Sequence, residues 1–226
     1  MQGYYLSSDG SACLLIEAVL LHRYDFNDGT AGDSVGGCAY EATVAGGAVV
    51  EGGQVNMAAF GIAGGYVNIP STVFGDYADS AVSIEVWFSA SFNSGWARVF
   101  EFGLSNDDFI LLARDGGDGH LQLQYFDTPY LFNDLVNVYA VLTMSAGSPA
   151  ELYINSSRVA TSTAVVDPIP TPAVFFIGKS LYYGDVGFNG SVNEFRVWGG
   201  ILSQANITQH YQEGPSKFPA QFNFFS

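Results

Sequence analysis

The sequence has few basic residues. Its 226 residues include 7 Lys and Arg against 22 Asp and Glu, so the formal net charge is −15. A surface with this balance repels phosphate groups, and we therefore expect neither nucleic acid nor an anionic membrane face as a partner. The acidity suits a soluble surface protein, but it does not define a site.

Long apolar runs are missing as well. A transmembrane helix needs about 20 consecutive apolar residues, and no segment reaches that length. The apolar stretch 12–21 is the best candidate for a signal sequence, but Glu17 interrupts it and no basic residue precedes it. The sequence therefore predicts neither a membrane span nor a signal peptide.

Cysteine is scarce: Cys13 and Cys38 are the only two. One interpretation is a disulfide that ties the N-terminal segment to the loop after the first strand, which would imply an oxidising compartment. The other is two free thiols, and both interpretations stay open. Neither cysteine has a second Cys or a His at metal-site spacing, so zinc is not expected.

What the sequence does contain is a series of short strand patterns. A hydrophobic content of 48% excludes disorder, and the length suits one domain. Segments rich in β-branched and aromatic residues alternate with turn residues, without the strand–helix rhythm of a parallel sheet, which favours two antiparallel sheets. The predicted strands are 20–26, 48–50, 65–69, 82–88, 98–102, 109–113, 121–126, 136–144, 151–155, 158–159, 174–177 and 188–198.

The last strand and the helix after it form the clearest element. Alternation places Phe195 and Val197 on one face of the strand, and Val192, Arg196 and Trp198 on the other. Trp87, on the strand 82–88, is predicted to anchor the core.

A short helix is predicted after this strand. Ser203 is a good N-cap, because its hydroxyl accepts an amide proton of the first turn, and Gly214 ends the helix. Ile207, His210 and Tyr211 share one helical face.

This strand–turn–helix element resembles the end of the laminin-G-like, concanavalin-A-type jelly-roll family. That family has a strand Gly-x-Ile-Asp-Glu-Val-Arg-Ile-Tyr, then Leu-Ser and a short helix ending in Gly. The matching residues here are Gly190, Val192, Glu194, Phe195, Arg196, Val197, Trp198, Leu202, Ser203, Ile207, Tyr211 and Gly214. The resemblance implies an all-β, two-sheet antiparallel jelly-roll β-sandwich with one short helix near the C-terminus.

Three regions are expected. Residues 1–19 form an N-terminal segment, whose part 3–13 resembles the tail of a cysteine-rich EGF-like repeat and so implies one module of a larger extracellular protein. Residues 20–214 form the sandwich. Residues 215–226 form an apolar tail with four phenylalanines, which either docks on its own domain or adds to a neighbouring subunit.

Hydrolytic chemistry is not supported by the sequence. Glycosidases need two carboxylates on either side of the scissile bond, whereas Glu85, Glu101 and Glu194 each stand alone on their predicted strands. The Gly-x-Ser-x-Gly match at 32–36 lacks the following helix that a nucleophile elbow requires, so it is interpreted as a loop.

Calcium is the metal that the sequence favours. Asp25, Asp28 and Asp33 lie within nine residues and offer hard oxygen ligands, although not at EF-hand spacing. The family resemblance implies Asp33 as the best single ligand. Asp and Gly in loops also simply make turns, and that alternative stays open.

Two further sets of surface residues are candidates. Asn155, Asn189 and Asn206 begin Asn-x-Ser/Thr triplets and are predicted N-glycosylation sites. Exposed aromatic rings beside polar groups suit sugar binding. The candidates for such a platform are Trp96, Tyr125, Tyr130, Tyr182 and Tyr183.

We therefore expect a non-catalytic recognition or adhesion module, outside the cell or at its surface, that binds glycan or protein. The alternatives are a structural subunit of a surface filament, and a glucanase-like hydrolase.

Overall fold

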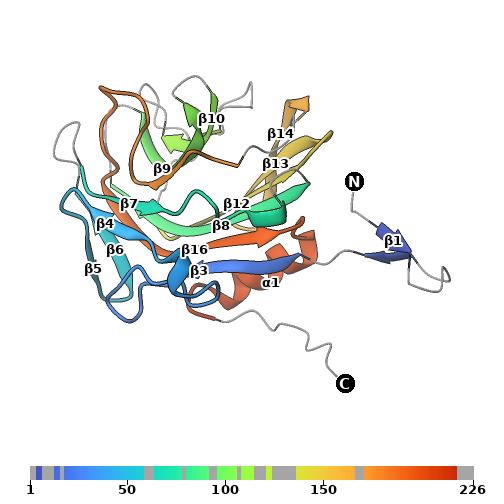
Figure 1. The fold of residues 1–226 in the computed structure, drawn as a ribbon, viewed down its shortest axis with the longest axis horizontal. Coiled ribbons are helices and arrows are strands. Elements are labelled where there is room, and N and C mark those ends of the chain that lie inside the picture. Colours follow the sequence, from blue (N-terminus) through green and yellow to red (C-terminus); the bar gives the residue numbers. More distant parts are fainter. Residues whose placement is uncertain are drawn as a thin grey trace.

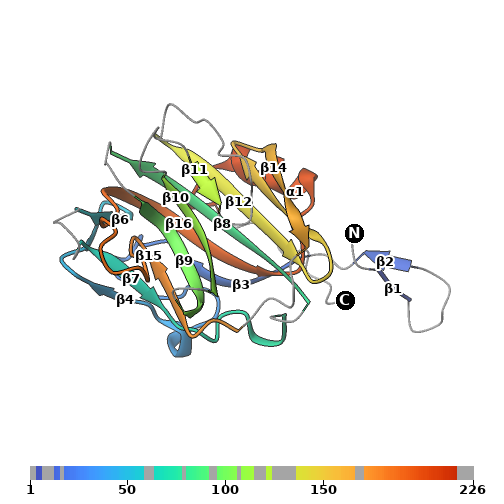
Figure 2. The ribbon, with the colours of Figure 1, turned by 90° about the horizontal axis from the view of Figure 1, so that it is seen from above.

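The main body of the protein is a sandwich of two antiparallel β-sheets (Figure 1). The structure, a computed structural model, describes residues 4–6, 13–15, 18–58, 64–77, 80–91, 96–105, 108–114, 121–123, 136–165 and 171–217. Seen from above, one sheet lies over the other with their strands running in similar directions (Figure 2). The predicted all-β sandwich is confirmed.

The smaller sheet has six strands in the order β11-β10-β9-β15-β7-β4. Their bounds are β4 (Thr43–Ala45), β7 (Tyr66–Ile69), β9 (Ala97–Ser105), β10 (Asp108–Arg114), β11 (Leu121–Leu123) and β15 (Val174–Ile177).

The larger sheet has eight strands in the order β14-β13-β12-β8-β16-β6-β5, with β3 also paired to β16. Their bounds are β3 (Val19–Tyr24), β5 (Val49–Glu51), β6 (Gln54–Met57), β8 (Ala81–Ala90), β12 (Val138–Ser145), β13 (Pro149–Ile154), β14 (Ser157–Val165) and β16 (Gly190–Gly199). The described residues also contain the helix α1 (Gln204–Glu213) and two 3₁₀ turns, Cys38–Tyr40 and Gly75–Tyr77. No helix in the described part of the chain is long and apolar enough to cross a bilayer.

The core lies between the two sheets, where alternate side chains of each strand meet. Phenylalanines dominate its centre: Phe175 of β15 contacts Phe100, Phe102 and Phe195, with ring centroids 5.0 Å apart for the pair with Phe102. All four rings are at most 1% exposed. Offset and edge-on aromatic packing of this kind adds to the free energy gained from burial.

The strand β16 departs from simple alternation. Its register against β8 shifts between Val192 and Glu194, so one extra residue is accommodated there as a bulge. Val192 therefore packs in the core with Phe195 and Val197. The prediction that Val192 shares a face with Arg196 was wrong, because a bulge reverses the alternation on one side of it.

The hairpin between β13 and β14 closes in two residues. Ile154 pairs with Ser157, and the turn residues Asn155 and Ser156 have φ values of 48° and 67°. This left-handed geometry matches the twist of a tight hairpin. The Asn155 side chain accepts a hydrogen bond from the Tyr139 amide at 3.0 Å. Asn155 and Ser156 thus adopt a backbone conformation that glycine adopts more easily than other residues.

The expected regions stay predictions. The sandwich begins with β3 at Val19 and α1 ends at Glu213. A separate strand pair, β1 (Tyr4–Leu6) with β2 (Cys13–Leu15), lies away from the sandwich at the right of Figure 1. The tail from residue 218 onward lies outside the described residues, so neither interpretation of it is tested.

Removing one central ring tests this account of the core. Phe175→Ala deletes the side chain that joins phenylalanines of β9 and β16, and we expect the free energy of unfolding to fall by about 3–5 kcal/mol in chemical denaturation. Val49→Ala, at a position 51% exposed, is the control and should change little. A small effect of Phe175→Ala would contradict the packing described.

Candidate functional site

The outer face of the eight-stranded sheet has a covered part and an open part. The helix α1 lies over the covered part, where its Ile207 and the preceding Leu202 join Trp87, Tyr139 and Trp198 in a second apolar cluster. Trp87 is 6% exposed, so the prediction that it is a core residue is confirmed, and the cluster that it joins lies on the outer face under the helix. The helix itself begins and ends as predicted.

Arg196 lies at the centre of the covered part and is 1% exposed. Its guanidinium donates to Glu194 Oε1 at 2.5 Å, to Glu85 Oε2 at 3.3 Å and to the Lys217 carbonyl at 2.7 Å. The guanidinium carbon also lies 4.5 Å from the centroid of the Trp87 ring. One buried cation therefore connects two strands and the segment after α1.

Glu85 is fully buried and has three further partners. It accepts hydrogen bonds from Tyr139 Oη at 2.6 Å and Trp198 Nε1 at 2.9 Å, and lies 2.8 Å from His210 Nδ1. Burial by itself raises the pKa of Glu85, but the hydrogen bond with His210 and the charge of Arg196 outweigh it and lower the pKa. The carboxylate is therefore kept ionised inside the protein.

Glu194 is bound from two further directions. Arg23 Nε donates to it at 2.6 Å and the Ser216 amide at 2.5 Å. Sequence reasoning treated Glu85 and Glu194 as isolated, and the strand register brings them to the same arginine. Both glutamates are 0% exposed, so neither carboxylate is accessible from the surface.

The loop after β3 contains the three predicted calcium ligands Asp25, Asp28 and Asp33. Asp33 is 7% exposed and holds this loop together. Its Oδ1 accepts amide protons from Arg23, Val35 and Gly36 at 2.9–3.0 Å, and its Oδ2 lies 2.5 Å from His22 Nδ1. Burial acts to raise the pKa of Asp33, and these hydrogen bonds lower it overall. The 32–36 motif forms turns here, and its interpretation as a loop is confirmed.

The other two aspartates have separate partners. Asp25 pairs with Arg23 at 2.9 Å, while Asp28 accepts from the Thr30 amide and hydroxyl, which lower its pKa. Within the described residues, no group of three or more His, Cys, Asp or Glu is placed to hold a metal. The carboxylates as placed do not fit one calcium ion, and the calcium site stays a prediction.

Cys38 is exposed and free. Cys13 lies in β2, but its side chain is outside the described residues, so the disulfide also stays a prediction. Of the three sequon asparagines, Asn206 is exposed at the start of α1, and Asn155 and Asn189 are half-buried. Nothing in the structure tests their glycosylation.

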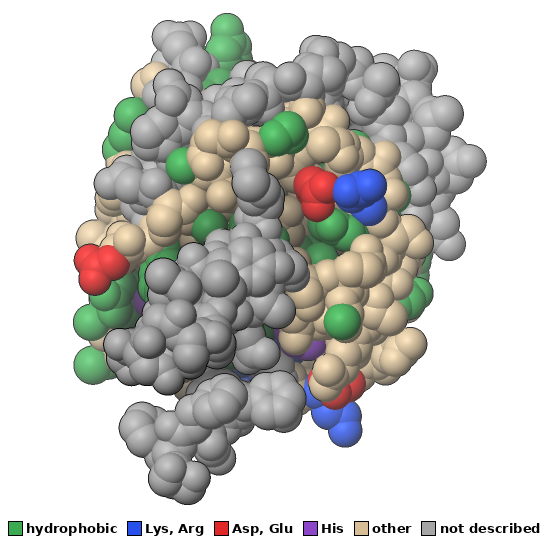
Figure 3. Space-filling view, turned by 90° about the vertical axis from the view of Figure 1, so that its right-hand side faces the viewer, with side chains coloured by type: hydrophobic (Ala, Val, Ile, Leu, Met, Phe, Trp, Pro, Cys, Tyr) green, Lys and Arg blue, Asp and Glu red, His purple; other side chains and the backbone are tan. Residues whose placement is uncertain are grey.

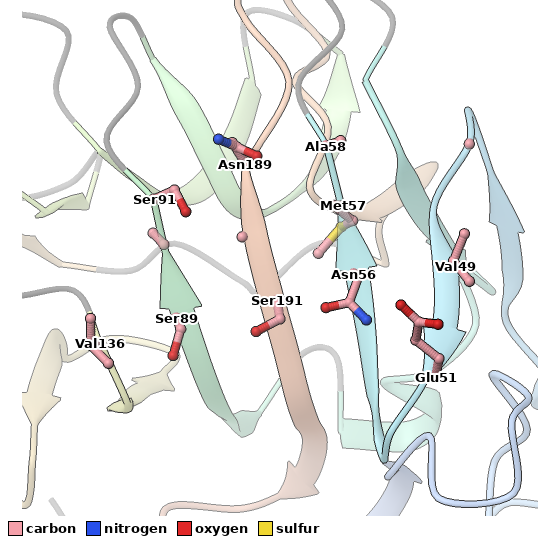
Figure 4. Close-up of a pocket in the computed structure, with 13 residues that line it drawn as sticks. Val49, Glu51, Asn56, Met57, Ala58, Ser89, Ser91, Val136, Asn189 and Ser191 are labelled. Carbon is pink, nitrogen blue, oxygen red and sulfur yellow. The ribbon is translucent and has the colours of Figure 1, made fainter.

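The open part of the same face is hollowed into a pocket of about 450 Å³ (Figure 4). It lies where β5, β6, β16 and β8 run side by side. The described residues that line it are Gly47, Val49, Glu51, Asn56, Met57, Ala58, Ser89, Ala90, Ser91, Val136, Asn189, Gly190 and Ser191.

The floor of the pocket is a row of directly paired residues. Ser191 of β16 pairs with Ser89 of β8 on one side and with Asn56 of β6 on the other, and Asn56 pairs in turn with Val49 of β5. Figure 4 shows these side chains lying across the strands. The surface is hollow here because the outward side chains are small serines. Further along the same strands, the outward positions carry the large side chains of Trp87 and Trp198.

The pocket offers hydroxyl and amide groups with an apolar rim. Val49 and Val136, 51% and 62% exposed, form its apolar part. Glu51 is the one carboxylate among the described lining residues. Glycine is required at position 190, because a Cβ there would lie only 2.1 Å from the Ser89 carbonyl oxygen of the neighbouring strand β8.

The sequence analysis did not find this pocket. Its polar residues are common ones, and they meet only because four strands pair in this order. Of the three polar floor residues, only Ser191 lies on a predicted strand, 188–198, since Ser89 follows the predicted strand 82–88 and Asn56 lies between two predicted strands.

Part of the predicted aromatic platform is exposed. Tyr183, Tyr182 and Trp96 are 91%, 55% and 38% exposed, whereas Tyr125 and Tyr130 lie outside the described residues. On the side of the molecule in Figure 3, basic side chains form no continuous patch over the described atoms.

The buried charge network is tested by removing its cation. Arg196→Met leaves Glu85 and Glu194 buried without their shared partner, so we expect a loss of about 3–5 kcal/mol in the free energy of unfolding. Arg158→Met is the matched control, since Arg158 pairs with Glu151 at the surface and its removal should change stability little. Equal effects of the two changes would contradict the network's role.

Calcium is tested by thermal denaturation of protein stripped with a chelator. An ion bound by the native state alone raises the melting temperature by mass action. If Asp28 is a ligand, Asp28→Asn removes that rise without disturbing the His22–Asp33 contact. An unchanged melting curve at millimolar calcium would exclude the ion.

Comparison with solved structures finds the same sandwich in proteins of low sequence identity. Domain 4 of AbnA, a GH43 extracellular arabinanase from Geobacillus stearothermophilus in complex with arabinotriose, is 18% identical, with a TM-score of 0.64 over 85% of this chain and 98% of that one. Comparison of the sequence with curated proteins finds no match.

Two larger proteins contain a similar region. The binding domain of botulinum neurotoxin DC, in complex with rat synaptotagmin II, is 13% identical with a TM-score of 0.64 over 86% of this chain. A Trypanosoma rangeli sialidase in complex with the inhibitor DANA is 16% identical with a TM-score of 0.66 over 92%. This chain spans 51% of the toxin domain and 35% of the sialidase.

A family model matches the sequence directly. The model Laminin_G_3, described as the concanavalin A-like lectin/glucanases superfamily, matches residues 61–208. This range includes the central strands β8, β12 and β16 and the start of α1. The match agrees with the resemblance of the closing strand and helix, and the chain belongs to the laminin-G-like branch of the concanavalin A-like lectin/glucanases superfamily.

Proposed function

We propose that this chain is a non-catalytic recognition module, outside the cell or at its surface, that binds glycan in the pocket of the eight-stranded sheet. The observation that carries the proposal is the pocket itself. It is open, and hydroxyl and amide groups from three neighbouring strands form its floor.

The pocket's chemistry suits a hydroxyl-rich ligand. Ser89, Ser191 and Asn56 can exchange hydrogen bonds with sugar hydroxyls, while Val49 and Val136 can contact the C–H groups of a sugar ring. A volume of about 450 Å³ lies within the range of small-ligand sites. The complex of a similar arabinanase domain with arabinotriose supports the same class of ligand.

Binding without hydrolysis is supported by the positions of the carboxylates. A glycosidase needs two carboxyl groups roughly 5–9.5 Å apart across the scissile bond. The described lining of the pocket contributes Glu51, whereas Glu85 and Glu194 are buried under α1 and bound to Arg196. A lone carboxylate can accept hydrogen bonds from sugar hydroxyls without cleaving the chain.

Filling the pocket tests the proposal. Ser191→Trp places an indole at the middle of the floor row, so we expect affinity for the best ligand from an oligosaccharide array to fall at least ten-fold in titration calorimetry. Thr161→Trp, at an exposed position on the edge strand β14 of the same sheet, is the matched control and should bind as the unmodified chain does. Unchanged affinity in Ser191→Trp would remove the pocket from the account.

The same preparation tests the absence of catalysis. Incubation with β-glucans and arabinans should release no reducing ends. Turnover that disappears in Glu51→Gln would instead assign the pocket to a hydrolase.

A further inference from the structure

The six-stranded sheet carries a second surface with a different chemistry. It is formed by Trp96, just before β9, and by Tyr182 and Tyr183 in the connection from β15 to β16. Tyr183 is 91% exposed, the most exposed large hydrophobic side chain among the described residues. Exposed apolar surface of this kind can mark an interaction site.

One buried arginine holds these aromatic residues in place. Arg98 is 4% exposed and donates to the Trp96 carbonyl at 2.7 Å, to Glu101 at 2.5 Å and to Asp185 at 2.7 Å. Its guanidinium carbon also lies 5.7 Å from the centroid of the Trp96 ring. A buried, fully paired arginine ties the start of β9 to the connection that carries both tyrosines.

The connection itself has a built hydrogen-bond framework. The Leu181 amide donates to Glu101 at 2.9 Å, the Ser180 hydroxyl to Asp185 at 2.9 Å, and the Tyr182 amide to the Ser180 hydroxyl at 2.9 Å. The exposed rings are therefore presented on a fixed backbone. A surface ordered in advance loses less conformational entropy when it binds.

The charges of the Arg98 network at this surface are paired with one another, and one further cation, Lys179, lies over aromatic rings. Both carboxylates and the guanidinium of the Arg98 network are committed to each other, and the nearby Lys179 ammonium lies 4.3 Å and 4.7 Å from the ring centroids of Tyr66 and Phe176. The net charge of −15 opposes an anionic ligand. What is left for a ligand is aromatic faces and phenol hydroxyls, which suit an uncharged sugar.

This surface and the pocket lie on opposite faces of the sandwich. Glu101 pairs in register with Phe176, whose neighbours Phe175 and Ile177 point into the core, so Glu101 faces outward from the six-stranded sheet. Ser191 precedes the core residue Val192 and faces outward from the eight-stranded sheet. The two sites therefore lie on different faces and share none of the described residues.

We propose that Trp96, Tyr182 and Tyr183 form a second binding site, which takes a neutral glycan by stacking sugar rings on the aromatic rings. The proposal does not depend on what the pocket binds. With both sites active, one molecule holds two glycan chains, one on each face of the sandwich.

The experiment uses the full chain and an array of neutral, sialylated and uronic-acid oligosaccharides, followed by titration of the best neutral oligosaccharide. In the Ser191→Trp background, which blocks the pocket, we expect neutral oligosaccharide to remain bound. Adding Tyr183→Ala should then lower the affinity at least ten-fold, because it removes the stacking ring. Adding Tyr183→Phe, which keeps the ring, should not.

Two controls separate binding from folding. Leu104→Ala removes an apolar side chain of β9 that is 51% exposed, and it should bind as its parent does. The melting temperature of Tyr183→Ala should match that of its parent, because a side chain that is 91% exposed makes few contacts.

Three results would overturn the second site. They are loss of all neutral binding in Ser191→Trp alone, equal binding by Tyr183→Ala and its parent, and tyrosine-dependent binding of acidic probes only. Tyrosine-dependent self-association without glycan binding would overturn it too, since the occupant would then be a second copy of the chain. Failure of the pocket proposal looks different, because Ser191→Trp would then bind like the unmodified chain.

Discussion

The positive charge of Arg196 is buried on the outer face of the eight-stranded sheet, and most of that face is arranged around it. A guanidinium keeps its charge in proteins, so at 1% exposure it requires anionic partners. Glu85 and Glu194 supply them, and the Lys217 carbonyl accepts a third hydrogen bond. Because these partners come from two strands and from the segment after α1, satisfying one charge also fixes the helix over the sheet.

This arrangement divides the outer face of the eight-stranded sheet into two parts with different side chains. Under α1 the outward side chains are large, and Trp87 and Trp198 fill the space. Beyond the helix the same strands carry Ser89 and Ser191, and the surface is hollow. Glu85 and Glu194 are bound to Arg196, whereas the described lining of the open part offers hydroxyl and amide groups and one carboxylate, Glu51.

The strongly acidic composition has a structural counterpart. The four arginines whose side chains the structure describes, Arg23, Arg98, Arg158 and Arg196, each pair with at least one carboxylate, and three of them are buried. These four cations thus neutralise acidic groups of the chain itself. A net charge of −15 repels anions from the surface.

Local patterns in the sequence determined the elements of this protein. Alternation located most strands, and Ser203 and Gly214 marked the ends of α1, because strand faces and helix caps depend on residues near one another in the chain. Only the tertiary structure decided the bulge after Val192 and the faces that it sets.

The tertiary structure alone also brought together Glu85 and Arg196, which are 111 residues apart in the sequence. The same is true of the pocket floor, which is formed by Ser89, Ser191 and Asn56. Such neighbours depend on which strands pair and in what register. That choice is made by burial of the whole core, and no short stretch of sequence contains it.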